Sequence, residues 1–435
     1  MSGVFDGLLS EITVVPVSAR LGRVTEIGRG TVTVAGLDRS ASLGDRVQIG
    51  HDHGGEILRL SREAVVILTD SASDGLRIGA EVRLVGQSTL APDDSWIGRI
   101  VDPFGRPLDG RPLFRGSKPR ALRPAAPPAA SRRHLGERLS TGVAVFDTLL
   151  PLVRGQRIGI FSGSGVGKST LLAKFARGVT ADVVVIGLIG ERGRELREFT
   201  ERVLGPEGMA RSVVITATSD QSALLRRRCA WTAMTVAEHF RDQGLHVLLL
   251  ADSVTRFAEA HREVALAGGE AASMRDYPPS VAGLITAWAE RAGPGVSGSG
   301  DITAVFTVLV AGSDMEEPIA DILRGVLDGH VVMDRKIAER GRFPAIDLLR
   351  SVSRSLPNAA TESENELISQ ARRLLGAYDR AEMMIQAGLY AKGSDSLVDA
   401  AIAVWDRLDG FLAKDATNDG IEGSFAMLKS ALALR

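Results

Sequence analysis

The hydrophobic positions of this 435-residue chain change their spacing from one region to the next. Between residues 21 and 90, short apolar runs alternate with polar positions and are separated by glycines. Such alternation is typical of strands with one buried face, and short strands in close succession predict a small β-barrel. The clearest of these runs are residues 31–34, 46–49, 64–68 and 81–84.

Between residues 135 and 355 the pattern consists of continuous apolar runs that alternate with stretches of helical spacing. A continuous run indicates a strand that is buried on both faces. Strands of this kind between helices predict an α/β fold, with a mostly parallel sheet between helical layers. The runs are residues 157–161, 183–189, 213–217, 247–251 and 302–310.

Helical spacing continues towards the C-terminus. Residues 361–409 carry it, most clearly in 371–386, and residues 424–434 predict a last helix. Residues 4–14 could form a helix with Phe5, Leu8, Leu9 and Ile12 on one face. Both a frayed terminus and a partner-binding helix remain as interpretations of this segment.

These patterns divide the chain into four parts. We expect an N-terminal partner-binding segment (1–20), a β-barrel domain (21–90), a central α/β domain (91–355) and a C-terminal helical domain (356–435). Within the central domain, residues 115–133 are rich in Pro and Ala and basic, which predicts an extended connector. A solvated loop is the default interpretation, and a contact with phosphate or lipid is the minority one.

Charge and composition narrow the function. The chain has 52 Lys and Arg against 53 Asp and Glu, and the barrel segment contains no Phe, Trp or Tyr. Neither feature suits a nucleic-acid binder, which needs a basic surface and often aromatic stacking platforms. The single cysteine, Cys229, is expected to be a packed core residue, and the chain shows no signal peptide or membrane-spanning run. We therefore expect a cytoplasmic protein.

The segment from Ser162 to Thr170 carries the strongest chemical signal. It reads Ser-Gly-Ser-Gly-Val-Gly-Lys-Ser-Thr, follows an apolar strand and precedes a helical stretch. This context predicts a phosphate-binding loop, although Ser162 stands where the pattern usually has glycine. Lys168 would reach the phosphates, and Ser169 would bind Mg²⁺. The other loop residues expected at the nucleotide are Gly163, Ser164, Gly165, Val166, Gly167 and Thr170.

Two acidic residues follow later strands. Asp252 ends the run 247–251, which suits a Mg²⁺ ligand, and the alternative is a helix N-cap before Ser253. Glu191 comes just after the run 183–189. It could activate the attacking water or pair with Arg192, Arg194 or Arg197, and spacing leaves both open. Because strand ends collect at one edge of a parallel sheet, Lys168 and both acids should meet there.

Three further motifs resemble a known family. The run Pro344–Ser353 (Pro-Ala-Ile-Asp-Leu-Leu-Arg-Ser-Val-Ser) is similar to the signature of rotary-ATPase catalytic subunits. Gly190–Arg192 and Leu249–Arg256 resemble its catalytic-glutamate and Asp-x-x-x-Arg segments, and Gly98–Gly110 also fits. The resemblance covers nearly the whole chain. Further runs resemble the flagellar protein-export branch, namely 258–265, 277–281, 318–321, 327–331 and 388–395.

The resemblance implies a fold and a set of roles. The fold would be a small N-terminal β-barrel, a central RecA-like P-loop NTPase domain and a C-terminal helical domain. Glu191, with Lys168 and Arg192, would belong to the catalytic set, and Phe343 would stack on adenine, with Tyr390 opposite. Arg354 would be an arginine finger delivered to a neighbouring subunit. Residues 270–276 depart from the family pattern, in a loop thought to face a central pore.

The predicted function is that of an ATPase that forms a hexameric ring and energises export of flagellar proteins. Its implied partners are further copies of itself, a stator-like regulatory protein at the N-terminal segment, a membrane export gate, and export substrates with their chaperones. Its implied place is the inner face of the cytoplasmic membrane. The alternatives are a virulence-type secretion ATPase, a non-catalytic ring subunit, and an RNA-translocating helicase.

Overall fold

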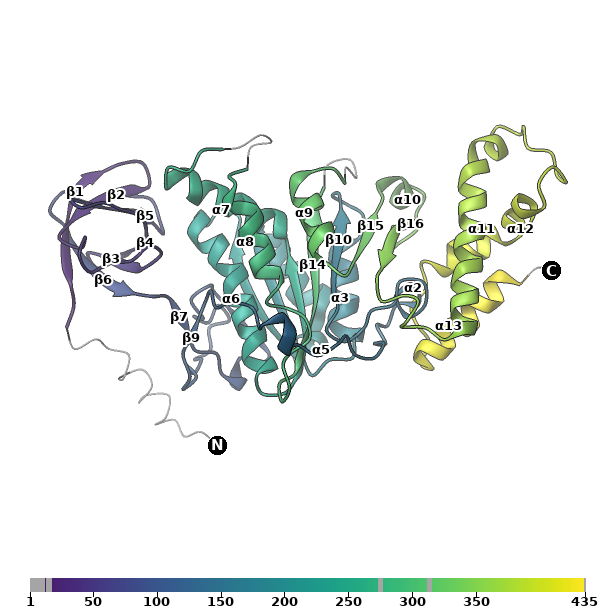
Figure 1. Ribbon diagram of the computed structural model, residues 1–435, viewed down its shortest axis with the longest axis horizontal. Coiled ribbons are helices and arrows are strands. Elements are labelled where there is room, and N and C mark those ends of the chain that lie inside the picture. The colour runs from purple at the N-terminus through teal and green to yellow at the C-terminus, as the bar shows by residue number, and fades with distance from the viewer. Residues whose placement is uncertain (1–11, 13–17, 273–276, 311–314, 434–435) are drawn as a thin grey trace.

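The computed structural model describes residues 12, 18–272, 277–310 and 315–433. It arranges them as a barrel at one end, a layered α/β domain in the middle and a group of helices at the other end (Figure 1). Apart from Ile12, the helix expected over residues 4–14 lies outside the described residues. Within the described ranges, none of the helices is long and apolar enough to cross a bilayer.

The N-terminal strands close into a barrel in the order β1-β2-β5-β4-β3-β6. Val24, Val34 and Ile67 are among the residues that point inward from alternate positions and form a core of their own. The predicted barrel is confirmed, and the apolar runs correspond to β2, β3, β5 and β6. The strand bounds are β1 Leu21–Ile27, β2 Thr31–Ala35, β3 Arg46–Ile49, β4 His53–Leu60, β5 Val65–Thr69 and β6 Glu81–Gly86.

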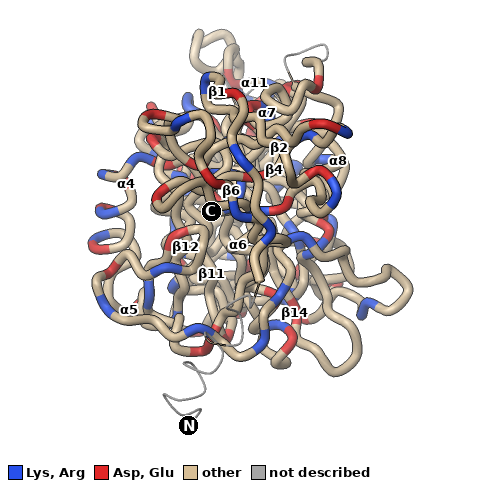
Figure 2. The backbone as a smooth tube through the Cα atoms, turned by 90° about the vertical axis from the view of Figure 1, so that its left-hand side faces the viewer, with Lys and Arg blue, Asp and Glu red and all other residues tan. Residues whose placement is uncertain are grey.

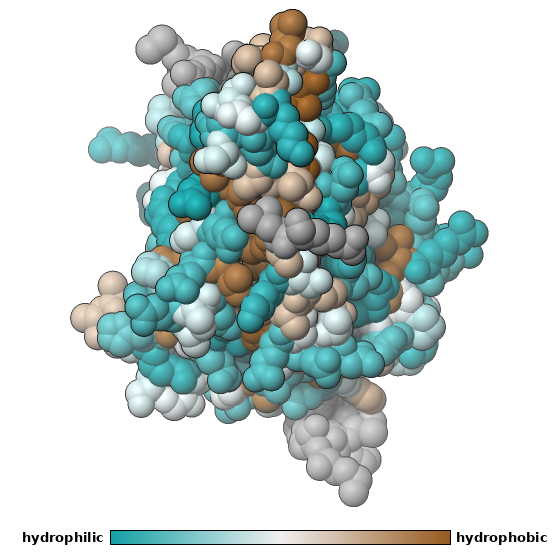
Figure 3. All heavy atoms as spheres, turned by 90° about the vertical axis from the view of Figure 1, so that its right-hand side faces the viewer, coloured by the Kyte–Doolittle hydropathy of each residue, from teal (hydrophilic) through white to brown (hydrophobic). Residues whose placement is uncertain are grey.

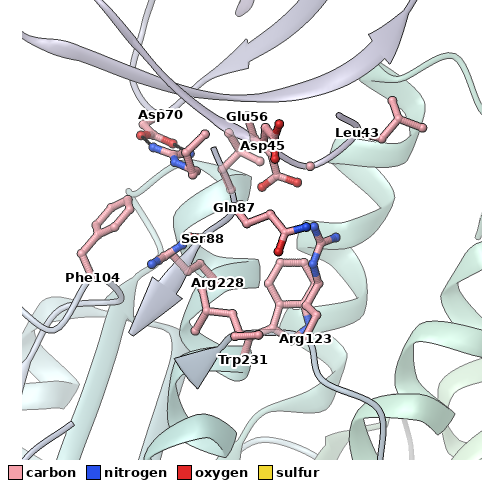
Figure 4. Close-up of a pocket in the computed structure, with 15 residues that line it drawn as sticks. Leu43, Asp45, Glu56, Asp70, Gln87, Ser88, Phe104, Arg123, Arg228 and Trp231 are labelled. Atoms are coloured by element: carbon pink, nitrogen blue, oxygen red, sulfur yellow. Dashed lines mark hydrogen bonds and ion pairs between the residues drawn. The ribbon is translucent and has the colours of Figure 1, made fainter. Parts of the chain in front are cut away.

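A charged junction joins the barrel to the central domain around a cavity of about 190 Å³ (Figure 4). Arg228 reaches into it from helix α6 (Ala223–Arg241), donates through Nε to the Pro103 carbonyl at 2.9 Å, and lies over the Phe104 ring. The neighbouring Arg227 pairs with Glu56 of the barrel at 2.8 Å. These contacts pair charges across the junction and tie the barrel to α6.

The central sheet has the strand order β16-β15-β10-β14-β13-β11-β12-β8. Its neighbouring strands are parallel except for β16, which runs antiparallel to β15. The strand bounds are β8 Arg99–Val101, β10 Arg157–Ser162, β11 Val183–Glu191, β12 Ser212–Thr218, β13 His246–Asp252, β14 Asp301–Leu309, β15 Gly329–Met333 and β16 Ile346–Ser353. A separate pair consists of β7 Thr89–Leu90 and β9 Arg120–Ala121.

Helices cover both faces of this sheet, as the continuous apolar runs predicted. Along β11, Val184 and Ile186 pack in the same cluster as Leu171 and Phe175 of α3, whereas Val183 and Val185 pack in the cluster that contains α6, α7 and α8. The remaining helix bounds are α2 Ala144–Asp147, α3 Lys168–Gly178, α4 Gly193–Glu198, α5 Gly205–Met209, α7 Val254–Ala267, α8 Ser280–Ala289, α9 Pro318–Val326 and α10 Arg335–Glu339. Two short 3₁₀ turns are η1 Asp94–Trp96 and η2 Ala129–Ser131, and η3 Phe199–Leu204 is a π-helical segment.

The basic connector of residues 115–133 runs along the central domain, and several of its arginines are anchored. Arg120 pairs with Asp242 and Arg133 with Asp301, each at 2.6 Å. Arg132 donates to the backbone carbonyl of Ala292 at 3.2 Å. The interpretation of a freely solvated loop is therefore wrong for these three arginines, because carboxylates and a backbone carbonyl that are distant in sequence bind them, although Arg133 stays exposed.

The C-terminal part consists of α11 Glu362–Gln386, α12 Ser396–Phe411 and α13 Gly420–Leu432. Thr361 and Glu364 form a reciprocal capping box at the start of α11. The Tyr378 ring of α11 stacks on Trp405 of α12 with ring centroids 3.6 Å apart. The predicted helical domain is confirmed, and α13 is the last helix expected from the pattern.

The surface is mixed in charge and in hydropathy. Lys and Arg are interspersed with Asp and Glu over the barrel end of the molecule (Figure 2). On the face formed by the C-terminal helices, hydrophobic residues lie among hydrophilic ones (Figure 3). The large exposed apolar side chains at the end of α11 and just beyond it are Met383, Met384 and Leu389.

Candidate active site

The predicted site lies at the carboxyl edge of the parallel strands. Strand β10 ends at Ser162 and leads into the glycine-rich loop, β11 ends at Glu191, and β13 ends at Asp252. In the sheet, β13 lies beside β11, and β14 separates it from β10. The topology therefore brings together residues that are 84 positions apart in sequence, as expected for parallel strands.

The glycine-rich loop has a backbone suited to an anion. Gly165 and Gly167 adopt left-handed φ angles of 77° and 88°, and α3 begins directly afterwards at Lys168. Such a turn aims successive N–H groups, including those of the first turn of α3, at one point. Val166 is buried and anchors the loop, while Ser164, Ser169 and Thr170 are exposed.

Ser162 is buried at the end of β10. Within the described residues the Ser162 hydroxyl has no hydrogen-bond partner. The residue therefore fits this position because its side chain is small, and not because it makes a polar contact. The small serine side chain is thus accommodated where the pattern has glycine.

The Lys168 ammonium lies between two carboxylates. Its Nζ is 2.5 Å from Asp252 Oδ1 and 3.8 Å from Glu191 Oε1. Thr307 of β14 donates its hydroxyl to the same Asp252 oxygen at 2.6 Å. Asp252 is only 3 % exposed, so these two donors compensate a buried charge. Ser253, and not Asp252, caps α7, because its side chain accepts the N–H of Arg256.

Glu191 has an unusual protonation equilibrium. Burial, together with the Asp252 charge, raises its pKa to about 7, and Lys168 opposes the shift. A carboxylate with a pKa near neutrality is a suitable proton acceptor at physiological pH. Of its proposed ion-pair partners, Arg192 pairs with Glu195 at 3.6 Å and Arg197 with Glu201 at 2.9 Å. Arg192, the N-cap residue of α4, thus pairs with an acid other than Glu191, and its catalytic role stays a prediction.

The two aromatic candidates lie in different places. Phe343 contacts the phosphate loop, since a Cβ at Gly167 would stand 3.1 Å from its ring, and its side chain is half exposed. Tyr390 lies between α11 and α12, where its hydroxyl is 3.0 Å from the Asp399 carboxylate. Figure 1 shows this turn at the far end of the molecule from β10. The structure therefore brings only Phe343 to the loop.

Arg354 lies at the opposite edge of the sheet from the phosphate loop. Because β16 is antiparallel to β15, its last residue, Ser353, pairs with Gly329 at the start of β15. The Arg354 backbone donates to the carbonyl of Asp328, and Asp328 contacts Arg157 at the start of β10. The loop begins at the other end of β10, roughly 17 Å away at about 3.3 Å per residue.

Comparisons with known proteins agree with this site. Residues 142–353 match the nucleotide-binding domain of the ATP synthase alpha/beta family, and residues 360–429 match the T3SS EscN ATPase C-terminal domain. The flagellum-specific ATP synthase of Caulobacter vibrioides is 43% identical, over 94% of this chain and 95% of its own. The chain belongs to the ATP synthase alpha/beta family.

Two further matches place it within that family. The type 3 secretion system ATPase of Pseudomonas syringae pv. tomato is 40% identical, over 94% of this chain and 92% of its own. The assembled ATPase EscN of enteropathogenic E. coli, in complex with its central stalk EscO, superposes with a TM-score of 0.86 at 36% identity, over 95% of this chain and 100% of that one. The predicted family and fold are confirmed, as is a nucleotide-binding ATPase.

Sequence reasoning missed Thr307. Its hydroxyl holds Asp252, yet it lies in an apolar run that predicts only a buried strand. The signal that could have found it is a single polar residue near the carboxyl end of such a run. Its partner is not evident from the sequence, because strand order has to be known first.

Proposed function

We propose that this chain hydrolyses ATP in a homohexameric ring and thereby energises the type III export of flagellar proteins. The observation that carries the proposal is the meeting of Lys168, Glu191 and Asp252 beside the phosphate loop. Phosphoryl transfer to water requires a cation for the phosphate, a carboxylate that can accept a proton and an oxygen ligand for a metal ion. Lys168, Glu191 and Asp252 offer these three groups in turn.

The residues present fit ATP and Mg²⁺. The positive-φ glycines Gly165 and Gly167 and the first turn of α3 would hold the phosphates, and the exposed half of the Phe343 ring would meet adenine. Ser169 and Asp252 offer the oxygen ligands that Mg²⁺ prefers, and the ion would supply charge neutralisation at the phosphates. Tyr390 lies farther from the phosphate loop than Phe343 does, so its contact with adenine has less support. Arg192 has the weakest support among the proposed catalytic residues.

Each residue has a separable task in this scheme. Lys168 would leave Asp252 for the phosphates, while Thr307 keeps its hydrogen bond to the Asp252 carboxylate. Glu191 would accept a proton from the attacking water, which is a task that a pKa near neutrality suits. Closure of the site by a neighbour would exclude bulk water and strengthen these interactions.

The ring follows from the position of Arg354. Its guanidinium is exposed, and it lies a full strand length from the phosphate loop of its own chain. An arginine finger there would serve the site of an adjacent copy, and one chain type would then complete all sites. EscN was solved as an assembled ATPase, which supports an oligomer.

Partners and location form the finer part of the proposal. EscN binds a central stalk, EscO, and a stalk-like or stator-like regulatory protein would bind this chain, with the N-terminal segment as one contact. A cytoplasmic ring at the inner face of the membrane would present export substrates and their chaperones to an export gate. The flagellar assignment is favoured over a virulence-type system because flagellum-specific relatives reach 44% identity, compared with 40% for the type 3 secretion system ATPase of Pseudomonas syringae.

Mixing two inactive variants tests the shared site. Lys168→Ala removes the phosphate contact from every site, and Arg354→Ala removes the finger from every site, so each ring alone should be nearly inactive. A mixed ring contains some interfaces with an intact loop on one chain and an intact finger on the next. ATP turnover should therefore return in the mixture. Mixed rings that assemble and stay inactive would contradict a finger acting between chains.

A genetic test separates the flagellar role from the virulence-type one. Deleting the gene should abolish motility and assembly of external flagellar proteins, and the wild-type gene, but not Lys168→Ala, should restore both. Intact motility with lost effector secretion would move the assignment to the virulence branch.

A further inference from the structure

A buried hydrogen-bond junction lies at the amino end of β10, away from the phosphate loop. Gln156 is fully buried there, and its Oε1 accepts the N–H of Val153 at 2.9 Å. Its Nε2 donates to the carbonyl of Asp328 and to the hydroxyl of Ser353, each at 3.0 Å. All the hydrogen-bonding groups of this amide are therefore used inside the core.

Both acceptors of the Gln156 amide belong to the backbone segments that hold Arg354, which are called the base of Arg354 below. Ser353 precedes Arg354 in the chain, and the Asp328 carbonyl also accepts the Arg354 N–H at 3.0 Å. A single buried side chain thus links the segment that carries Arg354 to the segment of Asp328, whose carbonyl binds the Arg354 backbone.

Arg157 holds the same base from a second direction. The Asp328 carboxylate accepts the Arg157 backbone N–H at 3.0 Å and its Nε at 3.1 Å. The Arg157 guanidinium also pairs with Glu290 at 2.7 Å. Because the carboxylate and the carbonyl of Asp328 are both bound, this residue has little freedom to shift.

The Arg354 side chain, by contrast, is lightly held. It is exposed, and its Nη2 donates to the carbonyl of Arg324 in the last turn of α9 at 3.0 Å. Such carbonyls accept readily, because the helix leaves them without an internal partner. A charged phosphate oxygen is a stronger acceptor for a guanidinium than a neutral carbonyl, so this contact can be exchanged.

We propose that Gln156 is a positioning residue for Arg354: it holds the base of the finger rigidly so that only the guanidinium moves to the neighbouring site. This inference rests on the proposed function, in which Arg354 acts across the subunit boundary. Placement of this kind matters because a shift of about 1 Å in a group that acts in the transition state can cost 10²-fold in rate.

The test uses Gln156→Met, which keeps length and removes the amide. In rings of one chain type, kcat should fall tenfold or more while KM for ATP stays within about twofold, because the finger acts in the transition state and not in nucleotide binding. Binding of a fluorescent ADP analogue should also stay unchanged. A matching rise in KM or loss of ADP binding would overturn the proposal.

Mixed rings supply the matched control. In a mixture of Lys168→Ala and Arg354→Ala chains, the first donates fingers and the second donates phosphate loops. Gln156→Met placed on the finger donor should reduce the restored activity tenfold or more. The same substitution placed on the loop donor, which has no finger to position, should leave the restored activity intact. Equal losses in both arms would show a role in the fold or in the chain's own loop, and would overturn the proposal.

A double-mutant cycle separates this inference from the proposed function. If mixed rings assemble but show no restored activity, the finger between chains is refuted, and the cycle decides on Gln156. Gln156→Met should then lower kcat in the wild-type background and have no further effect in the Arg354→Ala background; additive losses would overturn the inference. If circular dichroism shows that Gln156→Met does not fold, Asp328→Asn replaces it in both tests. Asp328→Asn loosens the same base because it weakens the contact between the Asp328 carboxylate and Arg157.

Discussion

At the scale of single residues, the ammonium of Lys168 lies between the carboxylates of Glu191 and Asp252. A bound phosphate would compete with these carboxylates for the ammonium. Its contact with Asp252 is buried and supported by Thr307, so the acid stays in place when the lysine moves. At equal distance, a multiply charged phosphate attracts the ammonium more strongly than a carboxylate does, which favours the proposed exchange. Lys168 is not among the α3 residues of the apolar core.

The first prediction concerns this lysine. Lys168→Ala should abolish Mg²⁺-dependent ATP turnover and leave the far-ultraviolet circular dichroism spectrum unchanged. The reason is that the removed ammonium contacts acids at the site, whereas the core clusters around α3 use Leu171, Leu172 and Phe175. Near wild-type turnover in a correctly folded variant would refute the phosphate-loop assignment. Lys174→Ala, on the outer side of the same helix where the lysine pairs with Asp415, is the matched control and should keep its activity.

The second prediction concerns Glu191. Glu191→Gln should still bind ATP and lose about 10²- to 10⁴-fold in kcat, because the amide keeps the shape of the carboxylate and loses its basicity. Single-turnover kinetics with a fluorescent nucleotide would separate binding from hydrolysis. An unchanged rate would return Glu191 to a purely ionic role beside Lys168.

The third prediction is a pH dependence of stability that originates at His246. Burial lowers the pKa of His246 to about 4, and its Nε2 lies 2.8 Å from the Thr303 hydroxyl. Because the folded state favours the neutral ring, its stabilisation is complete above the usual histidine pKa of about 6.5 and is lost as pH falls towards 4. Between pH 7 and pH 5 this loss amounts to about 2 kcal/mol.

Denaturant unfolding at the two pH values measures this effect. His246→Gln, which retains a polar side chain and does not titrate, should show a smaller acid-induced drop in the unfolding midpoint than the wild type. Equal drops in both proteins would mean that other groups, such as His261, whose pKa is also lowered to about 4 by burial, account for the whole dependence.

Residues whose chemistry depends on their own segment could be predicted from sequence, and residues that act across segments could not. Lys168, Glu191 and Asp252 each follow an apolar run, and parallel strands bring such positions to one edge. Thr307 and Gln156 have partners 55 and 172 or more positions away. Their roles depend on strand order, which the hydrophobic pattern does not contain.

At the scale of elements, the hydrophobic pattern predicted which residues form the buried strands and did not predict the position of each strand in the sheet. The long apolar runs correspond to β10, β11, β12, β13 and β14, all buried on two faces. Strands β15 and β16 were not predicted, because β16 alternates buried and exposed residues at the edge of the sheet. That edge strand carries the chain from the phosphate-loop side of the sheet to Arg354. The element that the pattern did not predict is therefore the one that separates Arg354 from the loop.

The fourth prediction concerns the N-terminal segment. Deleting residues 1–14 should leave the ATPase folded, because the barrel closes through β1 and β6, with Leu21 paired to Arg83 and Arg23 paired to Glu81. The same deletion should weaken binding to a stator-like regulatory protein, since Phe5, Leu8 and Leu9 would provide the apolar contact. Circular dichroism and a pull-down with the full-length chain as reference would measure both effects.

A control keeps these two effects apart. Full-length chain with Phe5→Ser and Leu9→Ser retains the segment and loses its apolar side chains, and it should bind as weakly as the truncated chain. An insoluble truncated chain would mean that the segment belongs to the core of the barrel domain.

At the scale of the whole molecule, the central sheet holds the phosphate loop and Arg354, the two halves of the proposed shared site, at its opposite edges. The phosphate loop follows the carboxyl end of β10, and the base of Arg354 is bound to Gln156 and Arg157 at its amino end. In the proposed scheme, the same strand positions the loop that the chain uses itself and the finger that it gives to a neighbour. A single copy would then have both halves and could not bring them together.

The fifth prediction follows from this separation. The ATPase activity per chain should rise with protein concentration and reach a plateau when rings are complete. An arginine finger contributes about 10³- to 10⁵-fold to turnover, so a dissociated chain should be almost inactive even with a correctly formed loop. Activity and light scattering measured on the same dilution series should show midpoints at the same concentration.

Arg354→Ala is the control that assigns this dependence to the finger. Its residual activity needs no neighbour, so its activity per chain should stay low and flat over the same dilution series, while light scattering still reports assembly. If the wild type kept full activity per chain at concentrations where scattering shows single chains, each chain would hold a complete site. Arg354 would then have no catalytic reason to face a neighbour, and the ring would serve export rather than hydrolysis.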